Sequence, residues 1–84
     1  MPLKYYVYML LCSDGTYYTG WSTDVHKRVA THNKGKGAKY TRGRLPVTLL
    51  WFDSVGSKSD AMKKEYTIKQ LNRKEKIRYI NDRK

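Results

Sequence analysis

The sequence predicts a small α+β fold whose elements follow the order β-β-α-β-α-α. Residues 5–12 and 16–22 are runs of strand-forming residues on either side of Ser13-Asp14-Gly15, a turn that indicates an antiparallel hairpin. A third run of this kind follows Pro46. Helical patterns preceded by capping residues fill much of the rest of the chain. A chain of 84 residues has the size of one domain, so we expect residues 1–84 to form a single domain.

The length of the hairpin loop decides on which faces of the sheet Tyr8 and Tyr18 lie. A two-residue loop would pair Leu11 with Tyr18 and place the two tyrosines on opposite faces. A three-residue loop would pair Leu10 with Tyr18, so the tyrosines would be diagonal neighbours on one face, about 7–8 Å apart between Cα atoms. We predict the three-residue loop, because Gly15 stands where that turn needs a positive φ.

Capping residues mark where the helices begin. Ser22-Thr23-Asp24 supplies an N-cap for a helix expected to end near Asn33. Residues 56–60 form an expected turn and cap before a second helix. Asn72-Arg73-Lys74-Glu75 has capping-box spacing and predicts a short last helix. Val25, Val29 and His32 fall on one stripe of the first helix, and Ile77 and Ile80 of the last helix are expected to point inward. The second helix carries Ala61, Met62, Glu65, Tyr66, Ile68 and Leu71.

Two further segments, a loop and a strand, and the single cysteine remain to be placed. Residues 35–44 carry three glycines and four cations and are expected to be a flexible basic loop. Residues 47–52 predict the third strand, which Pro46 opens at a position where a missing N–H is tolerated. Cys12 has no disulfide or metal-ligand partner at a suitable spacing, so we expect a buried core thiol.

The chain is strongly basic, with 18 Lys and Arg against seven Asp and Glu and a net charge of +11. A field of this sign attracts polyanions, so nucleic acid is the leading partner. The alternatives are a solvated basic surface without a specific partner and an anionic membrane. No apolar run reaches the ~20 residues of a membrane span, and no secretory signal pattern is present. We therefore expect a reduced, cytoplasmic protein.

Four polar side chains of the hairpin and the first helix are candidates for chemistry. Tyr8 and Tyr18 alone are most simply structural aromatics, and a phenol with a pKa of about 10 is a poor base at neutral pH. Arg28 and His32 stand four residues apart on a predicted helix, so they point the same way. The simple alternatives are an exposed charge for Arg28 and a half-buried, hydrogen-bonded imidazole for His32. Taken together, the four groups suggest phosphate chemistry.

One carboxylate is the main candidate for a metal ligand. Glu65 is embedded in the apolar pattern of the penultimate helix, where a carboxylate could hold a hard cation such as Mg²⁺. Asp53, at the end of the third strand, is a weaker second candidate. An ordinary surface glutamate is the simple alternative. The carboxylates with expected turn or cap tasks are Asp14, Asp24 and Glu75.

These residues together resemble the GIY-YIG nuclease superfamily, most closely its small stand-alone bacterial members. The resemblance rests on Tyr6-Val7-Tyr8, Tyr18-Thr19-Gly20, Arg28, His32 and Glu65, in identity, order and spacing, and extends over nearly the whole chain. It implies a three-stranded antiparallel sheet flanked by helices. It also implies metal-dependent cleavage of phosphodiester bonds.

The resemblance implies a role for each residue of the predicted site. One of Tyr8 and Tyr18 would position or deprotonate the attacking water, with a slight preference for Tyr18. Arg28 would stabilise charge on the scissile phosphate, and His32 would orient water or share the role of base. Glu65 would ligate one divalent ion, Mg²⁺ or Mn²⁺, and no small-molecule cofactor is expected.

The resemblance also implies contacts with nucleic acid. Gly20 would let the substrate backbone approach closely. Lys39-Tyr40-Thr41 is similar to a loop of the small bacterial members. We expect Lys39, Tyr40 and Arg42 to contact nucleic acid.

The sequence departs from the family pattern at a few positions. Tyr6 stands where the first motif has glycine, and Val7 conservatively replaces isoleucine. Trp21 stands where several relatives carry a lysine that helps to activate the second tyrosine, so Lys39 or Arg42 is a hypothetical substitute. No asparagine matches the one that some relatives place after the metal-binding glutamate.

The leading hypothesis is an endonuclease that acts on DNA with weak sequence selectivity, because so small a module buries little surface. The alternative is a nucleic-acid-binding module of the same fold with little or no cleavage activity. A protein-interaction domain for acidic partners would leave Tyr8, Tyr18 and Glu65 without a shared task. The choice between DNA and RNA, the substrate structure, the protein partners and the oligomeric state stay open.

Overall fold

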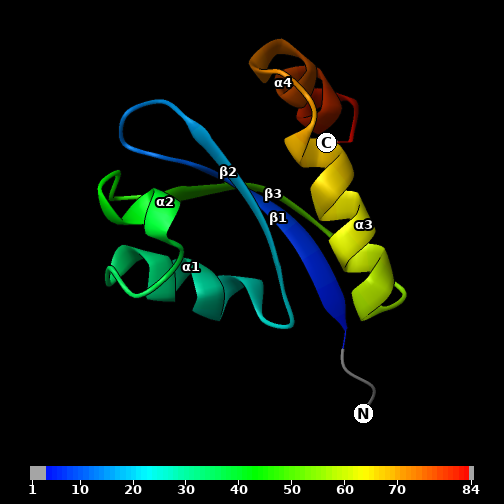
Figure 1. The fold of residues 1–84 in the computed structure, drawn as a ribbon, viewed down its shortest axis with the longest axis horizontal. Helices are drawn as coiled ribbons and strands as arrows, with labels where there is room; N and C mark the ends of the chain where they lie inside the picture. Colours follow the sequence, from blue (N-terminus) through cyan, green and yellow to red (C-terminus); the bar gives the residue numbers. More distant parts are fainter. Residues whose placement is uncertain (1–3, 84) are drawn as a thin grey trace.

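The computed structural model describes residues 4–83, which fold into one antiparallel sheet with helices on both faces (Figure 1). The strand order is β2-β1-β3, so β1 is central. The strands are β1 (Tyr5–Leu11), β2 (Tyr17–Ser22) and β3 (Thr48–Val55). The helices are α1 (Val25–Asn33), α2 (Lys39–Arg42), α3 (Lys58–Lys69) and α4 (Arg73–Asp82). The predicted element order is confirmed, with the short α2 as an addition.

The hairpin has the predicted three-residue loop. The backbone N–H of Cys12 donates to the Thr16 carbonyl at 2.8 Å, and Gly15 has a φ of +84°. Leu10 therefore pairs with Tyr18, and Tyr8 pairs with Gly20. The two tyrosines lie on the same face of the sheet, as predicted.

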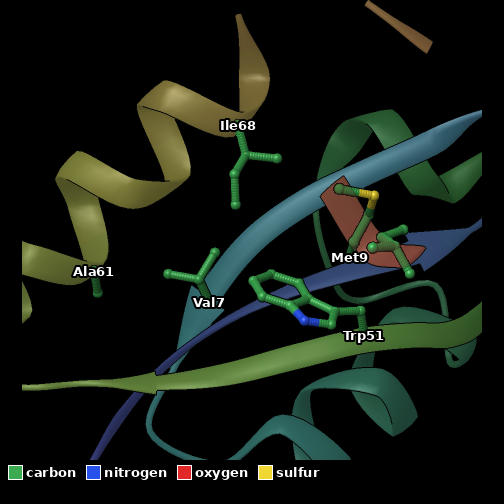
Figure 2. Close-up of a cluster of buried hydrophobic side chains, with 6 residues drawn as sticks. Val7, Met9, Trp51, Ala61 and Ile68 are labelled. Atoms are coloured by element: carbon green, nitrogen blue, oxygen red, sulfur yellow. The ribbon is translucent and has the colours of Figure 1, made fainter. Parts of the chain in front are cut away.

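Alternating residues of β1 supply two cores, one on each face of the sheet. Val7 and Met9 pack with Trp51, Ala61, Ile68 and Ile80 under α3 and α4, and Figure 2 shows most of this cluster. Tyr8, Leu10 and Cys12 pack with Val25 and Val47 on the face covered by α1. The thiol of Cys12 is buried, as predicted. Because β1 is buried on both faces, the side chain of Tyr8 is enclosed between the sheet and α1.

The predicted caps are present. The Asp24 side chain accepts from the Lys27 N–H at 3.1 Å, which fixes the start of α1. Asn72 and Glu75 form a reciprocal capping box at α4. Ser57 caps α3 by accepting from the Asp60 N–H, so this helix begins inside the segment predicted to be a turn.

Three expectations about the remaining elements were wrong. Residues 35–44 are not one flexible loop, because they contain α2, whose Thr41 is fully buried. The third strand extends beyond residue 52 to Val55. Ile77 does not point fully inward and is 38% exposed, whereas Ile80 is buried as expected.

Within residues 4–83, no helix is long and apolar enough to cross a membrane.

Replacing Ile68 by Ala should lower the free energy of unfolding by about 2–5 kcal/mol, because the fully buried side chain would leave a cavity under the sheet. Met62 is 53% exposed on the same helix, so Met62→Ala is the matched control and should change stability by less than about 0.5 kcal/mol. Urea titration of both variants measures the difference. Equal effects would contradict the assignment of Ile68 to the core.

Candidate active site

The structure brings the five predicted chemical groups to one cleft of about 570 Å³ at the β2 edge of the sheet. Tyr8 and Tyr18 come from the hairpin, and Arg28 and His32 from α1. Glu65 comes from α3 on the other face of the sheet, and it reaches the cleft because β2 is an edge strand. Two strands and two helices thus contribute to a single site.

A buried hydrogen bond joins the sheet to α1 at the bottom of this site. The Tyr8 hydroxyl lies 2.9 Å from His32 Nε2, and the two residues are 2% and 1% exposed. A Cβ at Gly20 would lie 2.6 Å from the Tyr8 hydroxyl oxygen, so only glycine leaves room for the phenol here. The group that approaches Gly20 closely is therefore Tyr8, whereas the sequence predicted a close approach by the substrate backbone.

The second ring nitrogen of His32 is enclosed by the segment after α1. Thr41 Oγ1 lies 2.9 Å from His32 Nδ1, and the Ala38 N–H approaches the same nitrogen at 3.4 Å. A Cβ at Gly37 would overlap the imidazole ring, so this position also requires glycine. The segment predicted to be a flexible loop is in fact the wall that holds His32.

Tyr18 lies against both aromatic and charged groups. Its ring centroid is 5.2 Å from that of His32 and 6.0 Å from that of Tyr40, which stacks on it. Lys69 Nζ lies 5.8 Å from the Tyr18 ring centroid and forms an ion pair with Glu65 at 3.1 Å. Lys69 thus links the second tyrosine to the carboxylate of the site.

Burial sets the protonation of the central groups. Desolvation raises the pKa of Tyr8 well above that of a free phenol, and the neighbouring Tyr18 adds to this increase. Desolvation also raises the pKa of Tyr18, although Lys69 opposes the shift. Burial and the nearby Arg28 lower the pKa of His32, so its imidazole is neutral at neutral pH. The buried part of the site is therefore uncharged.

Glu65 is the one predicted metal ligand that the cleft contains. Residues 4–83 hold no cluster of three or more His, Cys, Asp or Glu side chains placed to bind a metal ion. Mg²⁺ is commonly held by one or two carboxylates, with waters and substrate phosphates completing its shell, so a lone glutamate beside a phosphate site fits this ion. Asp53 does not line the cleft and forms an ion pair with Lys64 at 3.0 Å.

The basic segment, residues 35–44, lines the cleft with Lys36, Gly37 and Ala38, but not with the three residues predicted to contact nucleic acid. Lys39 and Arg42 are exposed on α2 and do not line the cleft, so neither stands where the missing lysine would act. Tyr40 stacks on Tyr18, and the Arg44 guanidinium carbon lies 4.1 Å from the Tyr40 ring centroid. Lys69 was not among the predicted site residues, although its position four residues after Glu65 on a predicted helix is a recognisable ion-pair signal.

The chain is similar to known proteins over most of its length. The model of the GIY-YIG catalytic domain matches residues 4–78. A UPF0213 protein of Halobacterium salinarum is 64% identical over 72 residues, which are 86% of this chain and 94% of that protein. A UPF0213 protein of Streptococcus agalactiae is 56% identical over 79 residues, 94% of this chain and 90% of that protein.

Two solution NMR structures are also similar. The UPF0213 protein of Bacillus halodurans is 47% identical, with a TM-score of 0.61, over 93% of this chain and 83% of that one. A protein of E. faecalis is 40% identical, with a TM-score of 0.65, over 94% of this chain and 84% of that one. The sheet and helices described above thus have experimentally determined counterparts.

The stability of the fold should fall as the pH drops below about 6.5, because the unfolded chain binds a proton on His32 more readily than the folded chain does. The contribution is fully present above the unfolded pKa of 6.5 and is lost as the pH falls toward the lower folded pKa. Thermal unfolding of the native chain and of His32→Gln between pH 8 and pH 5 checks this. Identical pH profiles for the two proteins would contradict it.

Replacing Gly37 by Ala should destabilise the fold by about 1–3 kcal/mol, because the new methyl group overlaps the His32 ring. Gly43 has no atom within 4 Å of an added Cβ and a negative φ of −92°, so Gly43→Ala is the matched control. Denaturant unfolding compares the two. If both substitutions had the same small effect, Gly37 would not be the residue that makes room for His32.

Proposed function

We propose that this chain, which belongs to the GIY-YIG family of nuclease domains, is a metal-dependent endonuclease that hydrolyses phosphodiester bonds of DNA. The family resemblance and the fold class predicted from the sequence are both confirmed. The observation that carries the proposal is the convergence of Tyr8, Tyr18, Arg28, His32 and Glu65 on one cleft. No other described cavity is lined by this set.

The general base is proposed to be the neutral imidazole of His32, acting through the Tyr8 hydroxyl. Both phenols have raised pKa values, so neither is a phenolate at neutral pH. His32 Nε2 is 2.9 Å from the Tyr8 oxygen, within reach of its proton. Water bound at the cleft would give its proton to Tyr8 as Tyr8 gives its own to His32. This geometry favours Tyr8 over Tyr18, reversing the slight preference drawn from the sequence.

Arg28 is proposed to bind the phosphate. Arg28 lines the cleft, and its guanidinium takes part in none of the ion pairs found among residues 4–83. A guanidinium presents a planar fork of N–H donors that matches phosphate oxygens. Charge that develops on the phosphate in the transition state would therefore meet a preorganised cation.

Glu65 is proposed to hold one Mg²⁺ or Mn²⁺ ion, which would supply Lewis-acid stabilisation of the phosphate and the leaving oxygen. Its side chain is 22% exposed and pairs with Lys69. Lys69 lies beside the Tyr18 ring and, with Arg28, opposes the rise in the pKa of Tyr18, so it is a better candidate than Lys39 or Arg42 to replace the lysine absent at Trp21. When the carboxylate binds a metal, the ammonium would be free to face the phosphate.

A charge of +11 supports a polyanionic substrate, and DNA is the one we propose. The protein has a small contact surface, and residues 4–83 hold only short helices and a three-stranded sheet. Weak sequence selectivity and strongly salt-dependent binding are the expected consequences. The second candidate function is a DNA-binding module without cleavage, and the ion pair that occupies Glu65 is the observation in its favour.

Nicking of supercoiled plasmid in the presence of Mg²⁺ or Mn²⁺ tests the proposal. The native chain should cut the plasmid, chelation of the metal should stop cutting, and Glu65→Gln should lower the rate by about 100-fold or more, because the metal ligand is lost. DNA binding, measured by fluorescence anisotropy at fixed salt, should persist in this variant.

Asp82→Asn is the control, because Asp82 is an exposed carboxylate at the end of α4, outside the cleft, and the substitution changes the charge by the same amount. It should cut at the native rate. Cutting that continues without metal, or at the native rate in Glu65→Gln, would overturn the catalytic proposal. Binding without cutting by the native chain would favour the binding module.

A further inference from the structure

Thr41 completes a buried chain of three side chains that runs from the cleft into the protein. Its side chain is fully buried, and Oγ1 lies 2.9 Å from His32 Nδ1. On the opposite edge of the same ring, Nε2 lies 2.9 Å from the Tyr8 hydroxyl. Tyr8, His32 and Thr41 come from β1, α1 and α2, so the chain connects three elements.

The contacts of Thr41 indicate which nitrogen of His32 carries the proton. Thr41 Oγ1 also lies 2.9 Å from the Ala38 carbonyl oxygen, and a carbonyl has no proton to share. The hydrogen bond to the Ala38 carbonyl therefore uses the single hydroxyl proton of Thr41. Toward His32, Thr41 can then only accept, which requires a proton on Nδ1 and leaves Nε2 as an acceptor facing Tyr8.

A competing donor approaches the same nitrogen. The Ala38 N–H is 3.4 Å from Nδ1, and its approach would favour the opposite tautomer. This contact is much longer than the 2.9 Å contact with Thr41, so the Thr41 contact dominates. The Ala38 N–H nevertheless stands ready to stabilise the other tautomer if the threonine hydroxyl is removed.

We propose that Thr41 is a positioning residue that fixes His32 in the Nδ1–H tautomer, so that Nε2 faces Tyr8 as the acceptor of its proton. The proposal rests on the function proposed above, in which the proton of Tyr8 moves to His32. The hydroxyl of Thr41 touches neither substrate nor the reacting atoms and acts only through the imidazole. Since the ring of a neutral histidine has one donor and one acceptor, the wrong tautomer would present Tyr8 with a donor.

The surroundings hold this arrangement in one geometry. Gly37 leaves the space that the His32 ring fills, and the burial of both side chains excludes water from Nδ1. Thr41 lies on α2, whose C-cap N–H bonds back to the Thr41 carbonyl. The imidazole is thus enclosed by α2 and the segment before it.

The test compares Thr41→Val, which removes only the hydroxyl function, with Thr41→Ser, which keeps it. Both are made in a His26→Gln background, because the chain has two histidines and His32 is then the single one. The two-bond ¹H–¹⁵N correlation spectrum of the imidazole identifies its tautomer directly. The His26→Gln protein and its Thr41→Ser variant should show a protonated Nδ1 and an unprotonated Nε2. In the Thr41→Val variant the tautomer equilibrium should shift toward a protonated Nε2.

Plasmid nicking by the same proteins gives the second measurement. In Thr41→Val the turnover rate should fall about 10- to 100-fold with little change in KM, which is no more than the lower end of the ~10²–10⁴-fold that general acid–base catalysis contributes. Thr41→Ser, which keeps the hydroxyl, should retain most of the turnover rate of the His26→Gln protein. A protonated Nε2 in the background protein, or an unchanged tautomer and rate in Thr41→Val, would overturn the proposal.

The spectrum of the background protein needs no catalysis and no folded valine variant. If Thr41→Val does not fold, a protonated Nδ1 in the background and in Thr41→Ser supports the tautomer assignment, and a protonated Nε2 there refutes it. Absence of cutting by the native chain would overturn the proposed function instead, whatever the spectra show.

Discussion

The hydrogen bond between the Tyr8 hydroxyl and His32 Nε2 is the contact on which the arrangement of the site depends. It ties the central strand to α1 inside the protein, where a broken bond would leave two buried polar groups unsatisfied. Gly20 makes room for one partner and Gly37 for the other. The three-residue hairpin loop sets the register that brings Tyr8 beside Gly20. Loop length, two glycines and one hydrogen bond are thus parts of a single constraint.

Around this contact, charge is arranged in layers. Tyr8, His32 and Thr41 are buried and neutral, which avoids the cost of desolvating an ion. The charged groups Arg28 and Glu65 line the cleft, where water, phosphate or a metal ion can solvate them. The proposed chemistry needs both layers, because a neutral relay can move a proton inward while cations at the surface hold the phosphate.

Much of the fold could be predicted because its signals are local. Gly15 set the hairpin register, and the capping box of Asn72 and Glu75 set the start of α4, each within a few residues. The helix α2 was missed because Thr41 is placed there by its contact with His32, nine residues earlier, and glycines at positions 35, 37 and 43 indicated a loop. The residues resembling the family motif converge as expected, and their proposed roles stay predictions.

The central claim is that Tyr8 and His32 act as one unit, and a double-mutant cycle in single-turnover cleavage tests it most directly. The rates of Tyr8→Phe, His32→Gln and the combined variant are compared with that of the native chain at saturating DNA. If the proton passes from Tyr8 to His32, the combined variant should be about as slow as the slower single variant, because either substitution breaks the same relay. If the rate loss of the combined variant equals the product of the two single losses, Tyr8 and His32 act independently, which would contradict the account.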